Sequence, residues 1–174
     1  MADWLRRAGW GRLPDGSVVT WTVAEGSRGR RWREVRTAGE GIVSSLLLET
    51  APDRRFAHLE LSTAAGLLTL HPEVDGTLHG NTVSAAGVAH VVAVPWPEGS
   101  VLLIEGSAIG DAAGAWQAAA AHGDAAQLTT TIGLDLTLRA STTASGQLVA
   151  LDLDPDGLPV PPESRSWPLE IEVN

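Results

Sequence analysis

Residues 128–139 read Leu128-Thr129-Thr130-Thr131-Ile132-Gly133-Leu134-Asp135-Leu136-Thr137-Leu138-Arg139. Most even positions of this segment are aliphatic, whereas the odd positions carry Thr, Gly, Asp and Arg. Alternation with a period of two is typical of a β-strand that has one dry and one solvated face. Strands with a polar face belong to antiparallel sheets. We therefore predict a long antiparallel strand over residues 127–139.

The same alternation recurs along the chain, with turn-forming pairs between the repeats. Asp15-Gly16, Asp75-Gly76 and Asp156-Gly157 stand where a hairpin needs a residue that tolerates positive φ. Further strands are predicted near residues 17–24, 30–37, 42–50, 54–61, 66–71, 76–83, 86–94, 100–106, 147–154 and 167–173. A β-meander is the simplest way to connect them. So many strands must curl or split to bury an apolar face, as in a sandwich, a barrel or a half-open barrel.

Two segments depart from this alternation. The alanine-rich stretch 110–123 has a candidate N-cap at Asp111 and ends at Gly123, which predicts one short helix or helical lid near 111–121. The stretch 155–163 is rich in proline, which lacks the N–H that a central strand needs, so a loop is predicted there.

Length and composition exclude several classes of protein. At 174 residues, the chain is expected to form a single β-rich domain over 1–174. It contains no cysteine and no lysine, which excludes disulfides, thiolate metal sites, Schiff-base chemistry and a P-loop lysine. No segment has the roughly 18 consecutive apolar residues of a membrane span. Without a targeting segment or cysteines, the expected location is the cytoplasm.

The charge is unevenly distributed. Residues 1–55 hold ten of the twelve arginines against seven acids, whereas the rest of the chain is strongly acidic. A basic third that also holds four tryptophans can attract an anion, or it can be a solvated face whose charges pair with nearby acids. The net charge of −9 opposes polyanions, so nucleic acid is not an expected partner.

No motif for catalysis or metal binding stands out. His71 and His79 flank a turn that contains Glu73 and Asp75, but a proline and a tight turn direct these side chains apart, so no metal is expected. His90 lies among valines and is interpreted as a hydrogen-bonded core residue or a ligand contact. No Gly-x-Ser-x-Gly motif is present, since Gly106-Ser107-Ala108-Ile109-Gly110 has its second glycine one place late. No cofactor is expected.

The seven tryptophans, beside one phenylalanine and no tyrosine, carry most of the aromatic area. They can fill a wide core, or some of them can line a cavity for an acyl chain or stack on a sugar. Trp116 in the predicted helix and Trp96 between two prolines are the best placed for a cavity rim.

The central part of the chain reads Leu78-His79-Gly80-Asn81-Thr82-Val83, followed by Gly99-Ser100-Val101-Leu102-Leu103-Ile104. In these motifs the chain resembles a bacterial glycolipid-binding family. The strands at Arg31-Trp32-Arg33 and Leu59-Glu60-Leu61, the segment 151–158 and Trp167 fall in a similar order. The family's aromatic and basic stretch is replaced here by the alanine-rich segment 111–126. The resemblance implies a single curved antiparallel sheet forming an incomplete β-barrel, similar to the periplasmic lipoprotein carriers, with a lipid or glycolipid ligand.

The leading hypothesis is a non-catalytic protein that binds a small lipid-like or glycolipid molecule in the concave apolar face of a half-barrel. Trp32, Trp96 and Trp116 are assigned to apolar contact, and His79 and Asn81 to a head group. Arg31 and Arg33 are assigned to an acidic head group, and His90 to a further ligand contact.

Two alternatives come from other classes of protein. One is a small β-barrel enzyme in which His90 or His79 works with a carboxylate as an acid–base pair. The other is an interaction domain without a ligand, whose sheet edge or apolar patch pairs with another protein or with a second copy as a homodimer.

Overall fold

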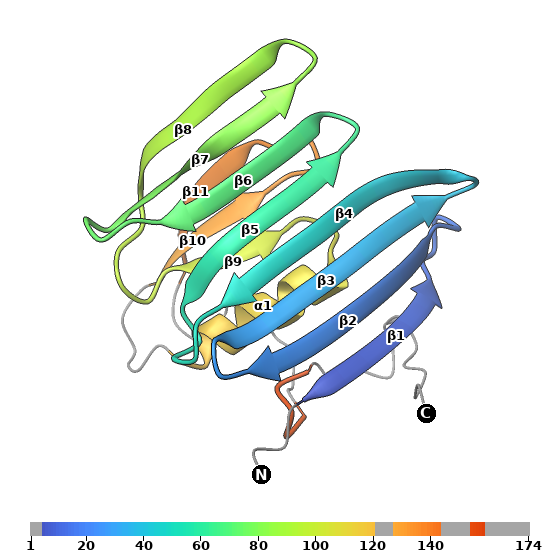
Figure 1. Cartoon of the computed structure of the whole chain (residues 1–174), viewed down its shortest axis with the longest axis horizontal. Coiled ribbons are helices and arrows are strands. Elements are labelled where there is room, and N and C mark those ends of the chain that lie inside the picture. The colour runs from blue at the N-terminus through green and yellow to red at the C-terminus, as the bar shows by residue number, and fades with distance from the viewer. Residues whose placement is uncertain (1–4, 121–126, 144–153, 159–174) are drawn as a thin grey trace.

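The main element of the structure is an eight-stranded antiparallel sheet in which the strands stand in chain order. The structure is a computed structural model and describes residues 5–120, 127–143 and 154–158. The strands are β1 (Arg6–Arg12), β2 (Val18–Gly26), β3 (Gly29–Ala38), β4 (Gly41–Thr50), β5 (Phe56–Thr63), β6 (Gly66–Pro72), β7 (Thr77–Ser84) and β8 (Gly87–Pro95). β1 and β8 form the two edges and do not close the sheet (Figure 1). The predicted mainly β fold, with a curved antiparallel sheet forming an incomplete barrel, is confirmed.

A second, three-stranded sheet was not predicted. It consists of β9 (Val101–Ile104), β10 (Gln127–Ile132) and β11 (Leu138–Thr143), with β10 in the middle. β9 and β10 are parallel, which requires a crossover connection, and α1 (Ala108–Ala118) lies between them in the chain. A meander with only antiparallel pairs is therefore wrong for this part of the molecule.

The long strand predicted over 127–139 is also wrong, because the chain reverses at residues 133–137. The N–H of Gly133 donates to the carbonyl oxygen of Thr137 (3.1 Å), and β11 then runs antiparallel to β10. Leu136 adopts a positive φ of 64° within this turn. The alternation hid the reversal because Leu134, Leu136 and Leu138 keep the even-numbered aliphatic pattern through it.

Other helix and strand boundaries differ from the predicted ones for local reasons. β1 was not predicted, because its sequence Arg-Arg-Ala-Gly-Trp-Gly-Arg does not alternate between apolar and polar residues. The segment forms a strand by pairing with β2. α1 begins three residues before the predicted helix, and its N-cap is Ser107, not Asp111. The hydroxyl of Ser107 accepts a hydrogen bond from the N–H of Gly110 (2.8 Å). The strands predicted near 147–154 and 167–173 lie outside the described residues, apart from Asp154, which begins a turn.

Five turns share one construction, at residues 13–17, 51–55, 73–77, 133–137 and 154–158. In each, the first N–H bonds the fifth carbonyl and the fourth N–H bonds the first carbonyl. An aspartate stands third, and the fourth residue has a positive φ. In the first turn, the N–H and hydroxyl of Ser17 donate to Asp15, which lowers the pKa of Asp15 to about 2. The left-handed position is glycine in three turns, but it is Arg54 or Leu136 in the other two.

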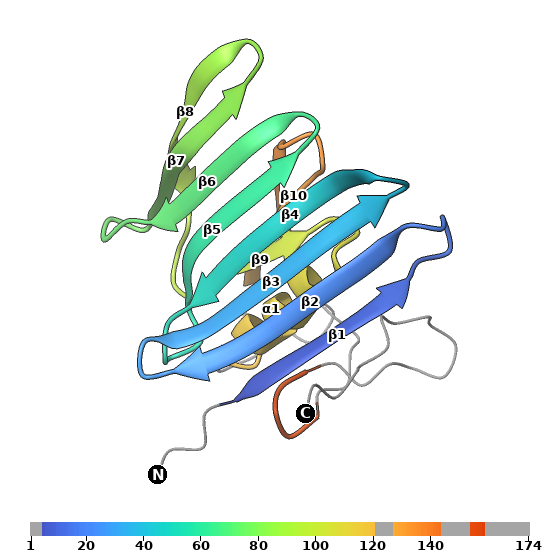
Figure 2. The same cartoon turned by 45° about the vertical axis from the view of Figure 1, so that its right-hand side comes forward.

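The eight-stranded sheet has two unlike faces. Figures 1 and 2 show α1 and the three-stranded sheet on one face, here called the inner face, whereas no described element covers most of the other, here called the open face. The inner face holds Trp32, Leu48, Leu59, Leu68 and Leu70, which are almost completely buried. α1 contacts β3, β4 and β9. Its glycines permit close approach, since a Cβ on Gly114 would lie 2.3 Å from Leu103 Cδ2.

Candidate ligand site

One end of the inner face gathers aromatic side chains and arginines. Arg30 on β3, Thr50 on β4 and Phe56 on β5 are register partners, so their side chains form a row across three strands. Trp96, which follows β8, packs edge-on against Phe56 with ring centroids 5.5 Å apart. We call Arg30, Trp32, Arg54, Phe56, Trp96 and Trp116 the tryptophan–arginine cluster.

Arg30 is the centre of this cluster. Its side chain is only 4% exposed. Its guanidinium donates to Glu25 Oε2 (3.0 Å from Nε) and to the carbonyl oxygen of Asp156 (2.5 Å from Nη1). The same group lies 3.6 Å from the ring centroid of Trp116 and 5.2 Å from that of Trp32. A buried guanidinium needs such partners, because an unpaired charge in the interior costs several kcal/mol.

Trp116, near the end of α1, is held between two guanidinium groups. Arg54 lies 3.8 Å from the Trp116 ring centroid, in addition to Arg30. Cation–π contacts of this kind contribute about 0.5–2 kcal/mol each, depending on how dry the site is. Gly157 also lies against the ring, since a Cβ at this position would be 2.3 Å from two of its carbons. Trp116 therefore attaches the end of α1 to β3, to the 51–55 turn and to the 154–158 turn.

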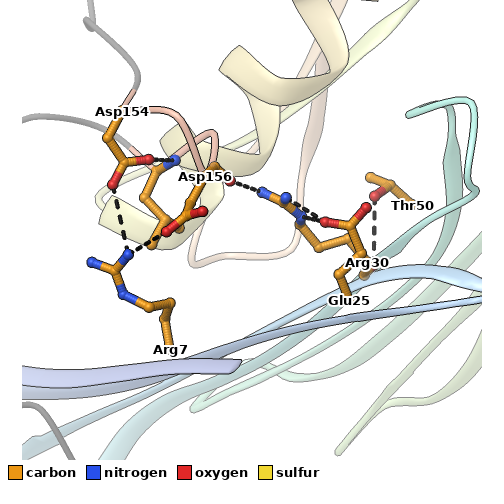
Figure 3. Close-up of polar contacts among 7 residues, drawn as sticks. Arg7, Glu25, Arg30, Thr50, Asp154 and Asp156 are labelled. Atoms are coloured by element: carbon orange, nitrogen blue, oxygen red, sulfur yellow. Dashed lines mark hydrogen bonds and ion pairs between the residues drawn. The ribbon is translucent and has the colours of Figure 1, made fainter. Parts of the chain in front are cut away.

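The 154–158 turn closes this end of the molecule (Figure 3). Arg7 Nη1 on β1 lies 2.5 Å from Asp156 Oδ2 and 3.9 Å from Asp154 Oδ2. Asp154 also accepts a hydrogen bond from the N–H of Leu158 (2.8 Å), and Leu158 is part of the core. The turn therefore joins β1 to the Arg30 side chain, as the dashed contacts in Figure 3 indicate.

A buried carboxylate holds the other end of α1. Glu34 on β3 is 4% exposed and accepts a hydrogen bond from the N–H of Ile109 (3.1 Å), in the first turn of the helix. A negative charge at a helix N-terminus is favourable, because the first N–H groups have no partner within the helix. Burial nevertheless raises the pKa of Glu34, and this effect exceeds the opposing hydrogen bonds from Ile109 and Ser107.

Among the residues that the structure describes, one buried donor on the inner face has no hydrogen-bond partner. Trp32 is fully buried, and its indole Nε1 forms no hydrogen bond. Most buried polar groups are paired, so an unpaired buried N–H is unusual in a folded protein. The hydroxyls of Thr129 and Thr130 on β10 are likewise buried and unpaired.

Arg54 is the free cation of the cluster. Its side chain is half-buried, and no carboxylate among the described residues pairs with it. Its φ of +69° is costly for a residue with a Cβ, by roughly 1–2 kcal/mol. Strain of this size persists where the surroundings hold the residue in place, and it is frequent at binding sites. The hydrogen bonds of the 51–55 turn hold the backbone of Arg54, and its side chain stacks on Trp116.

The predicted site residues divide between the two faces of the sheet. Trp32, Trp96 and Trp116, the three assigned to apolar contact, lie together at the covered end of the inner face. The four residues assigned to a head group and His90, assigned to a further ligand contact, face the opposite way; the four are Arg31, Arg33, His79 and Asn81. The structure therefore does not bring the predicted polar rim next to the predicted apolar contacts.

The residues on the open face have partners of their own. Arg31 donates to Glu49 (2.7 Å), and Asn81 Oδ1 lies 2.7 Å from His90 Nδ1. The interpretation of His90 as a core residue is wrong, because its side chain is exposed. Its neighbours on β8 are valines, but β8 is the uncovered edge of the sheet, so apolar neighbours do not imply burial there.

The described histidines form no acid–base pair in the interior. His58 lies 3.1 Å from Glu60 and His71 lies 3.1 Å from Glu73, but each pair joins side chains two residues apart on the open face. His122 lies outside the described residues. Among the residues that the structure describes, no group of three or more histidines and acids is placed to hold a metal ion.

Neither Arg30 nor Arg54 was predicted as a site residue. A signal for Arg54 was present, because three turns have Pro-Asp at their second and third positions, and two of them continue with glycine, at Pro14-Asp15-Gly16 and Pro155-Asp156-Gly157. The third reads Pro52-Asp53-Arg54, with arginine at the position that favours glycine. No comparable signal marks Arg30, whose burial depends on the 154–158 turn far along the chain.

Comparisons of the chain with protein-family models, with curated proteins and with solved structures gave no match. In the described part of the chain, no helix has the length and apolar character needed to cross a membrane.

Proposed function

We propose that this protein is a non-catalytic binding protein for an anionic, lipid-like molecule, whose tail enters the inner face beneath α1 and whose anionic group pairs with Arg54. The observation that carries the proposal is Arg54 itself: a half-buried guanidinium, strained in its backbone, stacked on Trp116 and without a carboxylate partner in the described residues. A carboxylate or phosphate would supply the missing counter-charge. The unpaired Trp32 Nε1 supports a nearby acceptor from the ligand.

The inner face suits an acyl tail, because its side chains are leucine and tryptophan. Those side chains are covered by α1, so uptake requires the helix to move. The buried part of α1 consists largely of small residues, including Ala112, Ala113 and Gly114. Ten methylenes buried in its place would contribute about 8 kcal/mol before the cost of ordering the tail.

The polar contacts at both ends of α1 are the ones that must open for the helix to move. Glu34 binds the first turn through a charge that burial destabilises, and Trp116 holds the last turn through cation–π contacts.

A fatty acid and an acidic glycolipid would both present the same chemistry to Arg54. Each has an anionic oxygen next to an apolar chain. A bacterial source and a cytoplasmic location stay predictions from the sequence.

The test compares sodium dodecanoate with dodecanol, below micelle-forming concentrations, by tryptophan fluorescence and native mass spectrometry. We expect the protein to bind dodecanoate with one-to-one stoichiometry. Arg54→Gly is expected to weaken dodecanoate binding at least about tenfold, a loss of about 1.4 kcal/mol, and to leave dodecanol binding unchanged. Glycine fits the backbone at this position, so the variant removes the charge without straining the turn.

The matched control is Arg55→Ala. Arg55 belongs to the same turn, but it is exposed and pairs with Asp53, so its loss should leave the affinity for dodecanoate unchanged. Absence of binding to either probe contradicts the proposal. Equal weakening by Arg54→Gly and Arg55→Ala contradicts the role of Arg54, because it would indicate a general charge effect.

A further inference from the structure

The two edges of the eight-stranded sheet are protected very differently. β1 carries three arginines in seven residues, and the 154–158 turn lies against it through Arg7. β8 reads Gly87-Val88-Ala89-His90-Val91-Val92-Ala93-Val94-Pro95, with no acid and no arginine. Natural proteins usually protect an open edge with charge, proline, a bulge or a cover, because its unpaired backbone groups attract another strand.

The β8 edge is exposed for most of its length. Val88 is 63% and Val92 is 62% exposed, and among the described elements only β7 pairs with the strand. Figures 1 and 2 show β8 at the edge of the sheet opposite β1, with no described element along its outer side. Val91 and Val94 face the core, whereas Val88 continues a cross-strand row of exposed apolar side chains with Leu67 and Val83 on the open face.

The straight part of the β8 edge carries similar apolar residues on either side of its midpoint. Gly87 has a φ of +115° and Ala93 a φ of +55°, with a register shift against β7 between Leu78 and Gly80, so the straight segment between them is 88–92. Its midpoint is His90. If a second copy of the strand runs antiparallel about that midpoint, Val88 faces Val92 of the other copy, Ala89 faces Val91, and no charged residue meets another.

We infer that β8 is a self-association edge, and that two copies of this chain pair antiparallel through residues 88–92 around a two-fold axis at His90. The pairing extends the apolar row of Leu67, Val83 and Val88 by Val92 of the second copy, which buries the exposed valines of both. The imidazole of His90 bonds to Asn81 on β7, which directs the ring away from the edge and leaves the axis open. Two-fold dimers are also the most common symmetric assemblies. This inference is independent of the ligand proposal.

Sedimentation equilibrium of the full chain tests the association. We expect a monomer–dimer equilibrium that Val92→Lys shifts at least about tenfold towards the monomer, because a lysine on an edge opposes strand pairing. Val74→Lys is the matched control: Val74 is a fully exposed valine in the turn between β6 and β7, and its substitution should leave the equilibrium unchanged. A wild-type protein that stays monomeric at all concentrations overturns the inference, as does an equal effect of the two lysines.

Single cysteines test the register, since the chain contains none of its own. Residues directly opposite in an antiparallel pair have Cα atoms about 4.5–5.5 Å apart, which is within disulfide range. We expect His90→Cys to form a disulfide-linked dimer on oxidation. Val88→Cys and Val92→Cys should each form no disulfide-linked dimer alone, and the two variants should form a mixed disulfide-linked dimer when combined. A Val88→Cys homodimer, or no dimer from His90→Cys, overturns the proposed axis.

Discussion

Arg30 and Arg31 are neighbours on β3, yet their side chains lie on opposite faces of the sheet and differ in burial. Arg30 points to the inner face, where it is almost fully buried, pairs with Glu25 and stacks on Trp116. Arg31 points to the open face, where it forms an exposed ion pair with Glu49. Alternation along a strand therefore assigns each residue to one face of the sheet, but it does not say which face forms a binding site. The following substitutions compare the two faces.

The largest effect is expected for tryptophan. Trp32→Ala removes a fully buried indole from the inner face and should lower the free energy of unfolding by about 3–5 kcal/mol. Trp10→Ala, on β1 with 44% of the residue exposed, should cost about 1 kcal/mol or less. Urea denaturation measures both. A similar cost for the two tryptophans would mean that the inner face is not the core.

The two arginines give the next comparison. Arg30→Ala leaves Glu25 without its partner and removes one guanidinium from Trp116, for an expected loss of about 2–4 kcal/mol. Arg31→Ala breaks an exposed pair and should cost about 0–1 kcal/mol. Thermal or urea unfolding of the two variants distinguishes them. An effect of Arg31→Ala as large as that of Arg30→Ala would contradict the burial of the cluster.

Glycine at two equivalent turn positions gives a smaller contrast. Gly16 and Gly157 both have positive φ, so alanine costs roughly 1–2 kcal/mol at either from the backbone alone. A Cβ on Gly16 meets nothing within 4 Å, whereas one on Gly157 would be 2.3 Å from the Trp116 ring. Gly157→Ala should therefore be more destabilising than Gly16→Ala by about 1 kcal/mol or more. Equal losses in urea denaturation would show that Gly157 does not pack on α1.

The smallest effect expected is the pH dependence from Glu34. Burial raises the pKa of Glu34 in the folded protein, so in the range just above its usual value of 4.5 the folded state binds more protons than the unfolded state. The contribution of Glu34 to stability is then greatest at low pH and declines as the pH rises through the raised pKa. Glu34→Gln keeps an acceptor for Ile109 and should remove this decline.

The measurement is the difference in unfolding free energy between wild type and Glu34→Gln from about pH 4 upward. The difference should move in favour of the glutamine variant as the pH rises. Glu34→Ala loses the acceptor for Ile109 altogether and should lower the free energy of unfolding by about 1–2 kcal/mol. This loss measures the helix cap, whereas the change with pH measures the titration of Glu34. A difference that does not change with pH, or changes in the opposite direction, contradicts the burial of a charged Glu34.

The sequence predicted most of the large sheet because its strands have a polar and an apolar face. Strand prediction failed where the alternation of apolar and polar residues does not follow the backbone conformation. Leu136 keeps the alternation through a turn, and β1 lacks alternation but pairs with β2. Trp32, Trp96 and Trp116 were chosen from the sequence for their large amphipathic rings, and their contact with a ligand stays a prediction. Their charged partners were not predicted, since Arg30 and Arg54 are brought to Trp116 by contacts between distant parts of the chain.

A crystal structure of the protein with 12-bromododecanoate tests directly whether the inner face binds the tail, because the anomalous signal of bromine locates the end of the tail. We expect the carboxylate at Arg54 and the bromine among the leucines of the inner face, with α1 displaced. Bromine on the open face, or a carboxylate paired with Arg31 or Arg33, would contradict it.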